Sequence, residues 1–212
     1  MQVTIAGTSF LLLPQRAIYS AQHSALILAD LHIGKSMHFR KGGIAIPGKV
    51  FDEDLLTLNT LIQQHQPQQL IIVGDMFHSH DNVEITLFDL WRAQYPQLTI
   101  NLVKGNHDIL PEEKYSQMGI TTHTTLSMGN FLFSHEPPAT YNQYCFSGHI
   151  HPGVRVEGAG RQSLRLPCFH VGSNNCTLPA FSRFTGLHTI KPVTGDRIFA
   201  VIENEIVPIQ AD

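Results

Sequence analysis

Five short groups of Asp, Asn and His residues in this sequence have the side chains and the spacing of metal ligands. They are Asp30-Leu31-His32, Gly74-Asp75, Gly105-Asn106-His107-Asp108, His135 and Gly148-His149-Ile150-His151. A chain of this composition is expected to contain G-H-x-H by chance only about 0.06 times, and G-N-H-D about 0.002 times. Carboxylate, amide and imidazole groups together suit Mn, Fe or Zn, whereas an all-oxygen set would suit Mg or Ca. The groups therefore predict a site for divalent transition metals.

Two such metals close together would support phosphate-ester chemistry. Cations about 3.5–4 Å apart can clamp a phosphoryl group and lower the pKa of a bridging water. A shared anionic ligand is needed to hold them so close, and Asp75 is the natural bridge. Because Asp30 and Asp75 are two carboxylates against two dications, the site stays positive even after it binds hydroxide, and it favours a phosphate anion.

Each of the five groups follows a short apolar run that is typical of a buried strand. The predicted strands cover residues 25–29, 70–73, 98–103, 131–133 and 144–146. Binding sites of α/β sheets lie at the carboxyl ends of the strands, and neighbouring strands are about 4.8 Å apart. We therefore expect the five groups to meet in one small volume.

The segments around these strands predict an α/β fold with mixed sheets. One helix is expected over residues 51–62 and a second over residues 84–94, the latter with Leu87, Leu90 and Trp91 facing inward. Turns are expected near residues 7–8, 128–130 and 203–205, and the chain after Gly153 has the pattern of strands and loops. Helices alternate with strands early and strands dominate late, and no repeat or linker divides the 212 residues, so we expect a single domain.

Composition excludes several classes of protein. A hydrophobic fraction of 42% excludes intrinsic disorder, and a net charge of −3 argues against a uniformly basic nucleic-acid coat. The three cysteines, none in a C-x-x-C pair, make a disulfide framework or a zinc knuckle unlikely and favour a reducing cytoplasm. No apolar run approaches the ~18 residues that span a bilayer, so no membrane association is expected.

The order D-x-H, G-D, G-N-H-[DE], H and G-H-x-H resembles the signature of the calcineurin-like metallophosphoesterases. The resemblance implies two mixed sheets packed as a sandwich and flanked by helices. It implies two metal sites that share one ligand: Asp30, His32, Asp75 and His151 for the first, and Asp75, Asn106, His135 and His149 for the second. It also implies that metal-bound hydroxide attacks phosphorus, while His107 acts as the general acid and Asp108 orients its imidazole.

The segments ALILADLHIGK, VKGNHD and SGHIHPG are similar to those of small bacterial phosphoesterases associated with DNA ligase. This narrower resemblance implies an Mn-dependent endonuclease or phosphodiesterase of the DNA damage response, with Fe and Zn also compatible with the ligands, and a functional association with a DNA ligase. One segment departs from the wider family. Where many members carry N-P-G-S, this chain has His170-Val171-Gly172-Ser173, so substrate contacts from that loop cannot be transferred.

Basic and histidine side chains beside the five groups are candidates for contact with the substrate: His38, Arg40, Lys41 and His78. The segment 158–195 is free of acidic residues and carries Arg161, Arg165, Arg183 and Lys191. Such a basic rim would position a polynucleotide, although ordinary solvated loops have the same composition. Two rival functions stay open at this point: hydrolysis of small phosphoesters or cyclic nucleotides, and a non-catalytic scaffold, which the complete ligand set disfavours. The oligomeric state is open as well.

Overall fold

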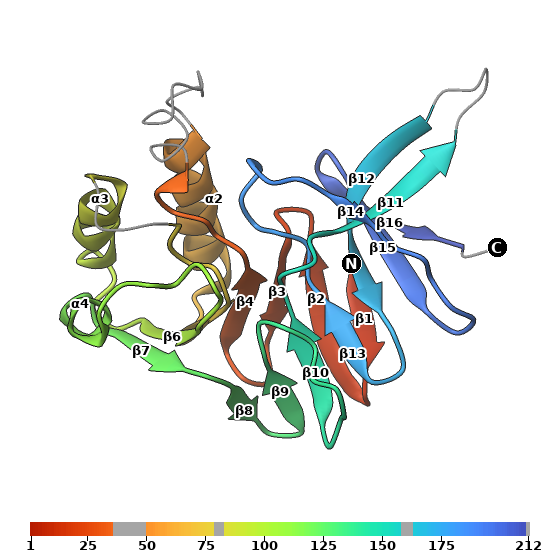
Figure 1. The fold of residues 1–212 in the computed structure, drawn as a ribbon, viewed down its shortest axis with the longest axis horizontal. Helices are drawn as coiled ribbons and strands as arrows, with labels where there is room; N and C mark the ends of the chain where they lie inside the picture. Colours follow the sequence, from red (N-terminus) through yellow and green to blue (C-terminus); the bar gives the residue numbers. More distant parts are fainter. Residues whose placement is uncertain (36–49, 79–82, 158–162, 211–212) are drawn as a thin grey trace.

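Two β-sheets form the body of the protein in a computed structural model that describes residues 1–35, 50–78, 83–157 and 163–210 (Figure 1). The first sheet has the order β1-β2-β3-β4-β5-β6-β7. Its strands are β1 (Gln2–Ile5), β2 (Thr8–Leu13), β3 (Ala17–Ser20), β4 (Ala25–Ala29), β5 (Gln69–Val73), β6 (Thr99–Val103) and β7 (Ile120–His123). Pairing is antiparallel from β1 to β4 and parallel from β4 to β7, so the sheet is mixed.

The second sheet has the order β14-β11-β12-β13-β10-β9-β8, and β15 pairs with both β12 and β16. Its strands are β8 (Leu126–Met128), β9 (Phe131–Phe133), β10 (Tyr144–Ser147), β11 (Pro152–Glu157), β12 (Ser163–Val171), β13 (Asn175–Thr177), β14 (His188–Thr189), β15 (Arg197–Ile202) and β16 (Glu205–Ile209). β10 runs parallel to β9 and β13, whereas β8 and β9 form an antiparallel hairpin, so this sheet is mixed too.

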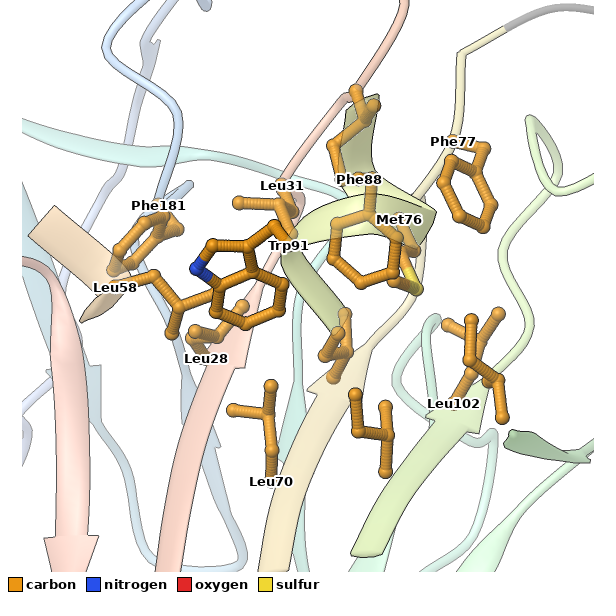
Figure 2. Packing of buried hydrophobic residues seen from close by; sticks show 14 of the residues in the cluster. Leu28, Leu31, Leu58, Leu70, Met76, Phe77, Phe88, Trp91, Leu102 and Phe181 are labelled. Carbon is orange, nitrogen blue, oxygen red and sulfur yellow. The ribbon is translucent and has the colours of Figure 1, made fainter. Parts of the chain in front are cut away.

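The two sheets face each other across one apolar core. Alternate residues of β4 point to opposite sides: Ile27 packs with Phe146 and Phe169 of the second sheet, and Leu28 packs with the helices. Helices α2 (Val50–His65), α3 (Val83–Arg92) and α4 (Glu112–Gln117) therefore lie on the outer face of the first sheet (Figure 1). Figure 2 shows this outer core, in which Trp91 lies among aliphatic side chains of the helices and strands.

The predicted fold class and the five strands before the ligand groups are confirmed. β4 and β9 match their predicted bounds, β5 begins one residue earlier, β6 one residue later, and β10 ends one residue later. The three expected turns are present, although Glu205 belongs to β16 because it pairs with Ile202. The short α4 was not predicted, because Tyr115 is its one buried residue and sets no apolar period. None of the described helices is long and apolar enough to cross a membrane.

The predicted inward face of α3 is wrong for two of its three residues. Leu87 and Leu90 are 43% and 64% exposed, while Ile85 and Phe88 are buried together with Trp91. Both sets have helical spacing, so periodicity alone could not separate them. The ring of Phe88, 5.1 Å from that of Trp91 and 5.6 Å from that of Phe77, packs in the core and fixes the rotation of the helix.

Candidate metal centre

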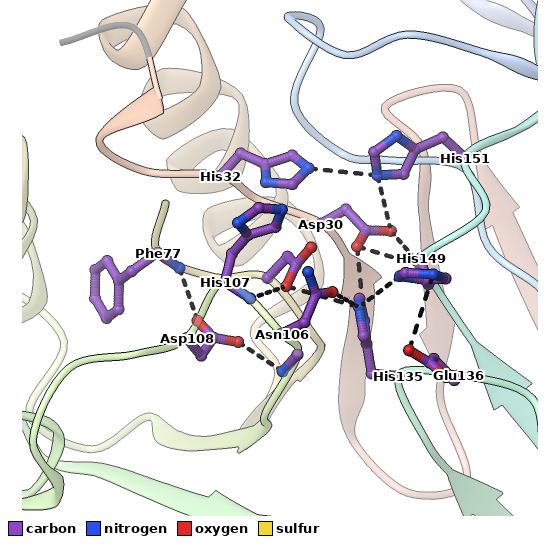
Figure 3. Close-up of polar contacts among 12 residues, drawn as sticks. Asp30, His32, Phe77, Asn106, His107, Asp108, His135, Glu136, His149 and His151 are labelled. Atoms are coloured by element: carbon purple, nitrogen blue, oxygen red, sulfur yellow. Dashed lines mark hydrogen bonds and ion pairs between the residues drawn. The ribbon is translucent and has the colours of Figure 1, made fainter. Parts of the chain in front are cut away.

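The five ligand groups meet at one place, as their positions after the strands predicted. Asp30, Asp75 and Asn106 follow the neighbouring strands β4, β5 and β6 of the first sheet. His135 follows β9 and His149 follows β10, which are neighbours in the second sheet. Figure 3 shows Asp30, Asn106, His135 and His149 pointing toward one another between the two sets of strand ends. Both sheets therefore contribute to one candidate centre.

One group of possible ligand atoms joins Asp30, His32 and His151, all within 4.8 Å of one another. The Nε2 atoms of His32 and His151 are 3.3 Å apart, and His151 Nε2 is 3.7 Å from Asp30 Oδ2. The structure thus brings together three of the four residues that the resemblance implies for the first metal. Two imidazole nitrogens that face each other beside a carboxylate can all direct lone pairs at one cation.

A second group joins Asp30, Asp75 and His135. His135 Nδ1 lies 3.8 Å from Asp30 Oδ1, and His135 Nε2 lies 3.6 Å from Asp75 Oδ1. The remaining two residues implied for the second metal adjoin the same imidazole, because His135 Nε2 is 3.2 Å from Asn106 Oδ1 and 3.0 Å from His149 Nδ1. Asp30 belongs to both groups in this structure, whereas the resemblance implies Asp75 as the shared ligand; that bridging role stays a prediction.

The burial of these groups fits a bound cation. Asp30 is fully buried and Asp75 is 3% exposed, although the described residues place no lysine or arginine in an ion pair with either carboxylate. Burial raises the pKa of Asp30, and burial together with the nearby charges of Lys35 and His151 lowers the pKa of His32 to about 2. The Nδ1 atoms of His32 and His135 are buried without a hydrogen-bond partner. Buried carboxylates beside imidazoles with unused nitrogens form a donor set that divalent metals satisfy.

The backbone of the centre is unusual at the ligands themselves. Five of the seven predicted ligands have a positive φ between +46° and +66°: Asp30, His32, Asp75, His149 and His151. Non-glycine residues seldom adopt this region, and such conformations gather at functional sites. The tight turns after β4, β5 and β10 thus bend each strand end so that consecutive side chains reach the same volume.

Two glycines allow the strand ends to approach each other. Gly74 has a φ of +80°, and a Cβ there would lie 1.7 Å from His135 Nδ1. A Cβ on Gly148 would lie 2.7 Å from both Asp30 Oδ2 and the Val73 carbonyl oxygen. Real Cβ atoms do not tolerate these distances, so the G-D and G-H-x-H groups need glycine for a steric reason.

His107 and Asp108 follow β6, but their side chains point in different directions (Figure 3). The main-chain N–H of His107 donates to Asp75 Oδ1 at 3.0 Å, and its ring centroid is 4.2 Å from that of His78. Asp108 instead accepts hydrogen bonds from the main-chain N–H groups of Phe77 at 2.9 Å and Gly105 at 2.8 Å. Main-chain amides engage both oxygens of Asp108, and its predicted role in orienting the His107 imidazole stays a prediction. Burial raises the pKa of Asp108 to about 7 despite these bonds.

The remaining sequence candidates have different outcomes. His78 lies at the centre, with its ring 5.6 Å from that of His32. His38, Arg40 and Lys41 lie outside the described residues. Sequence reasoning missed Glu84, a buried residue of α3 whose Oε2 accepts the main-chain N–H of Gly34 at 2.8 Å and so ties the helix to the loop that carries His32. A glutamate in the first turn of a predicted helix was its sole signal.

Comparisons with known proteins agree with this geometry. The family model of calcineurin-like phosphoesterases matches residues 23–175. The chain is similar to the crystal structure of the Pseudomonas putida nuclease MPE, with 29% sequence identity, a TM-score of 0.84 and 99% of each chain covered. Yfce, a phosphoesterase from E. coli, matches with 12% identity and a TM-score of 0.43 over 89% of this chain and 99% of that one, which is too distant to support an argument. No curated protein matches the chain. Because the family model spans most of the sequence and includes all five ligand groups, the chain belongs to the calcineurin-like phosphoesterase family and is a metal-dependent phosphoesterase.

Proposed function

We propose that this protein is a phosphodiesterase that hydrolyses nucleic-acid phosphodiesters with two divalent metal ions. The observation that carries the proposal is the convergence of seven candidate ligands and His107 at the strand ends of both sheets (Figure 3). The choice of nucleic acid is supported by the likeness of the whole chain to a protein described as a nuclease. Manganese is the proposed metal; the ligand set also suits Fe and Zn.

When bound, two cations would act as Lewis acids on the phosphoryl oxygens and lower the pKa of a water molecule. Asp30, His32 and His151 would hold one of them, together with Asp75. The other would be held by a set that surrounds one imidazole: Asp75, Asn106, His135 and His149.

His107 is the proposed general acid. Its main chain is fixed by the carboxylate of Asp75, so its position is tied to that of a metal ligand. The ring lies beside those of His32 and His78, with centroids 6.1 Å and 4.2 Å away, and it would donate a proton to the leaving oxygen. His78 packs against the face of this ring and is a candidate contact for the substrate phosphate.

Asp108 has a supporting role in this proposal. By accepting the N–H groups of Phe77 and Gly105, it joins the loop after β5 to the loop after β6. These loops carry Asp75 and His107, so Asp108 fixes the distance between a metal ligand and the general acid. Its contribution is positional, and it makes no proposed contact with the substrate.

The test replaces His107 by Ala and compares the variant with His188→Ala, which removes an exposed histidine of β14. We expect His107→Ala to lower kcat on a model phosphodiester by about 10²–10⁴-fold, the usual range for a lost general acid or base, with an unchanged metal content. His188→Ala should match the wild type in both measurements. Loss of metal together with activity in the His107 variant would make His107 a ligand and overturn its proposed role.

Substrate class is tested by a matrix of metals and substrates. A model diester, a phosphomonoester, a cyclic nucleotide, single-stranded DNA and double-stranded DNA are assayed with Mn, Fe and Zn after elemental analysis of the purified protein. Hydrolysis of a DNA strand supports the proposal, whereas turnover of the monoester or of cyclic nucleotides alone would contradict it. Functional association with a DNA ligase and a cytoplasmic location stay predictions from the sequence.

A further inference from the structure

A two-stranded ribbon extends from the candidate metal centre. β11 begins at Pro152, directly after the candidate ligand His151, and pairs antiparallel with β12. Figure 1 shows both strands projecting beyond the body of the two sheets. At about 3.3 Å per residue, Arg155 lies about 13 Å along this ribbon from His151. That length corresponds to about four base-pair steps of 3.4 Å in a nucleic-acid duplex.

Two arginines lie directly opposite each other on the ribbon. The register pairs Arg155 with Arg165, and paired residues of antiparallel strands share one face. Both are exposed, and like charges in this arrangement repel. Arg155 has an ion pair with Glu157 at 3.5 Å, but both side chains are more than half exposed, so the pair contributes little. Arg165 has no ion-pair partner among the described residues.

The strand that carries Arg165 borders a cavity. Pro167 is two residues from Arg165 on β12, so the two share a face, and Pro167 lines a cavity of about 500 Å³ together with Arg16 and Arg183. Burial and the charge of Arg183 lower the pKa of Arg16, and the charge of Asp54 opposes this effect. Two acidic residues, Asp54 and Glu203, also line the cavity.

Main-chain hydrogen bonds connect the cavity wall to the end of β4. The N–H of Phe181 donates to the carbonyl oxygen of Ala29 at 2.8 Å, and the N–H of Ser182 donates to the carbonyl oxygen of Asp30 at 3.3 Å. Arg183 follows directly, and Arg16 donates to the carbonyl oxygens of Ala180 and Ser182. Four arginines thus make up one candidate binding surface, with Arg16 and Arg183 at the cavity and Arg155 and Arg165 on the ribbon. We call it the arginine surface.

We propose that the arginine surface binds the phosphate backbone of the nucleic-acid substrate on one side of the phosphodiester that is hydrolysed. This inference rests on the proposed function and specifies where the nucleic-acid strand binds. Guanidinium groups match phosphate geometry with paired hydrogen bonds, and they bind a strand without reading its sequence. A phosphate next to the opposed pair would also relieve the repulsion between Arg155 and Arg165.

The test uses Arg165→Gln and the double variant Arg155→Gln/Arg165→Gln in the full-length protein. Lys114→Gln is the matched control, because it removes one positive charge from α4 at the other end of the molecule (Figure 1). Each protein is assayed on a 24-nucleotide single-stranded DNA and on bis(p-nitrophenyl) phosphate, which is too small to reach the ribbon. Binding to the DNA is measured over a range of salt concentrations with Ca²⁺ in place of the catalytic metal.

We expect the arginine variants to raise KM for the DNA and to leave kinetics on the small diester unchanged. The slope of log K against log salt should flatten by about 0.7 for each arginine removed, the value for a single strand. The ratio of kcat/KM on DNA to kcat/KM on the small diester is the deciding quantity, because it cancels any loss of active enzyme. A ratio and a salt slope equal to those of the wild type would overturn the arginine surface. Wild-type protein that hydrolyses the diester but no DNA would overturn the proposed substrate instead, and the arginine surface with it.

Discussion

At the scale of single residues, the ligands of the candidate centre could be predicted from the sequence, whereas their backbone conformations could not. The types and spacing of Asp30, His32 and the later groups predicted which side chains meet. Their positive φ angles came only from the structure, because they depend on how the turns after β4, β5 and β10 are closed. Such conformations cost of order 1–3 kcal/mol each and persist where the surroundings hold them. Asp and His tolerate this region better than branched residues, so the ligand types also suit the turns.

The hydrogen-bond partners of Asp108 could not be predicted from the sequence for a similar reason. Sequence places it beside His107, but its hydrogen-bond partner Phe77 is 31 residues away. Tertiary contacts decide which donor a carboxylate such as that of Asp108 accepts a hydrogen bond from. Local sequence could therefore identify the residue as part of the site and could not give its partner.

Asp54, which lies in α2 outside the metal centre, gives a residue-scale prediction about pH. Burial raises its pKa from an ordinary value of 3.8 to about 6, against the opposing effects of hydrogen bonds to Ser182 and Arg183. A raised pKa means that the folded state binds this proton more tightly, so the contribution to stability is full below pH 3.8 and is lost as the pH rises through 6. Between pH 5 and pH 7.5 the wild type should lose on the order of 1 kcal/mol of unfolding free energy relative to Asp54→Asn.

Urea unfolding of both proteins at the two pH values measures this difference. Asp89→Asn, which removes an exposed carboxylate of α3, serves as the control and should show no comparable change with pH. A difference between wild type and Asp54→Asn that is the same at pH 5 and pH 7.5 would contradict the raised pKa.

At the scale of elements, the strands before the ligands were predictable because most of their residues are buried. The run at β4 is apolar without interruption, as expected for a strand covered on both faces. The rotation of α3 and the register of β11 with β12 were not predictable, because each depends on partners far along the chain. The opposed pair of Arg155 and Arg165 is one result: ten residues separate them in sequence, and only the register shows that they face each other.

The approach of β10 to β4 and β5 gives an element-scale prediction. Gly148 directly follows β10, and a Cβ there would meet the carbonyl oxygen of Val73, which belongs to the backbone and cannot rotate away. Gly148→Ala should therefore push the strand ends apart, lower stability by about 1–3 kcal/mol and weaken metal binding. Gly186→Ala is a matched control, because nothing lies within 4 Å of a Cβ at that position. Thermal unfolding and metal titration of both variants give the comparison, and equal behaviour would show that the contact at Gly148 is easily relieved.

At the scale of the whole molecule, the candidate centre joins the two sheets at their carboxyl ends. Asp30, His32 and Asp75 come from the first sheet, whereas His135, His149 and His151 come from the second. The same sheets are held together by the apolar core around Phe146 and Phe169. Five of the thirteen histidines are assigned to this junction: His32, His107, His135, His149 and His151. That the chain forms one domain stays a prediction, and it agrees with a centre to which both sheets contribute.

A centre that joins the sheets should couple metal binding to global stability. Binding to the folded state alone adds about 2.7 kcal/mol at a free metal concentration 100-fold above Kd, which raises Tm by about 5–10 °C for a chain of this length. We therefore expect Mn²⁺ added to chelator-treated protein to raise Tm by that amount. Asp75→Asn should lose most of the shift and should retain fewer than two metals per chain, because Asp75 is proposed to ligate both ions. Asp52→Asn, which removes an exposed carboxylate at the start of α2, should keep the full shift. If Asp75→Asn binds two metals and keeps the shift, Asp75 is not the bridging ligand, and Asp30, which lies in both groups of ligand atoms, takes that role.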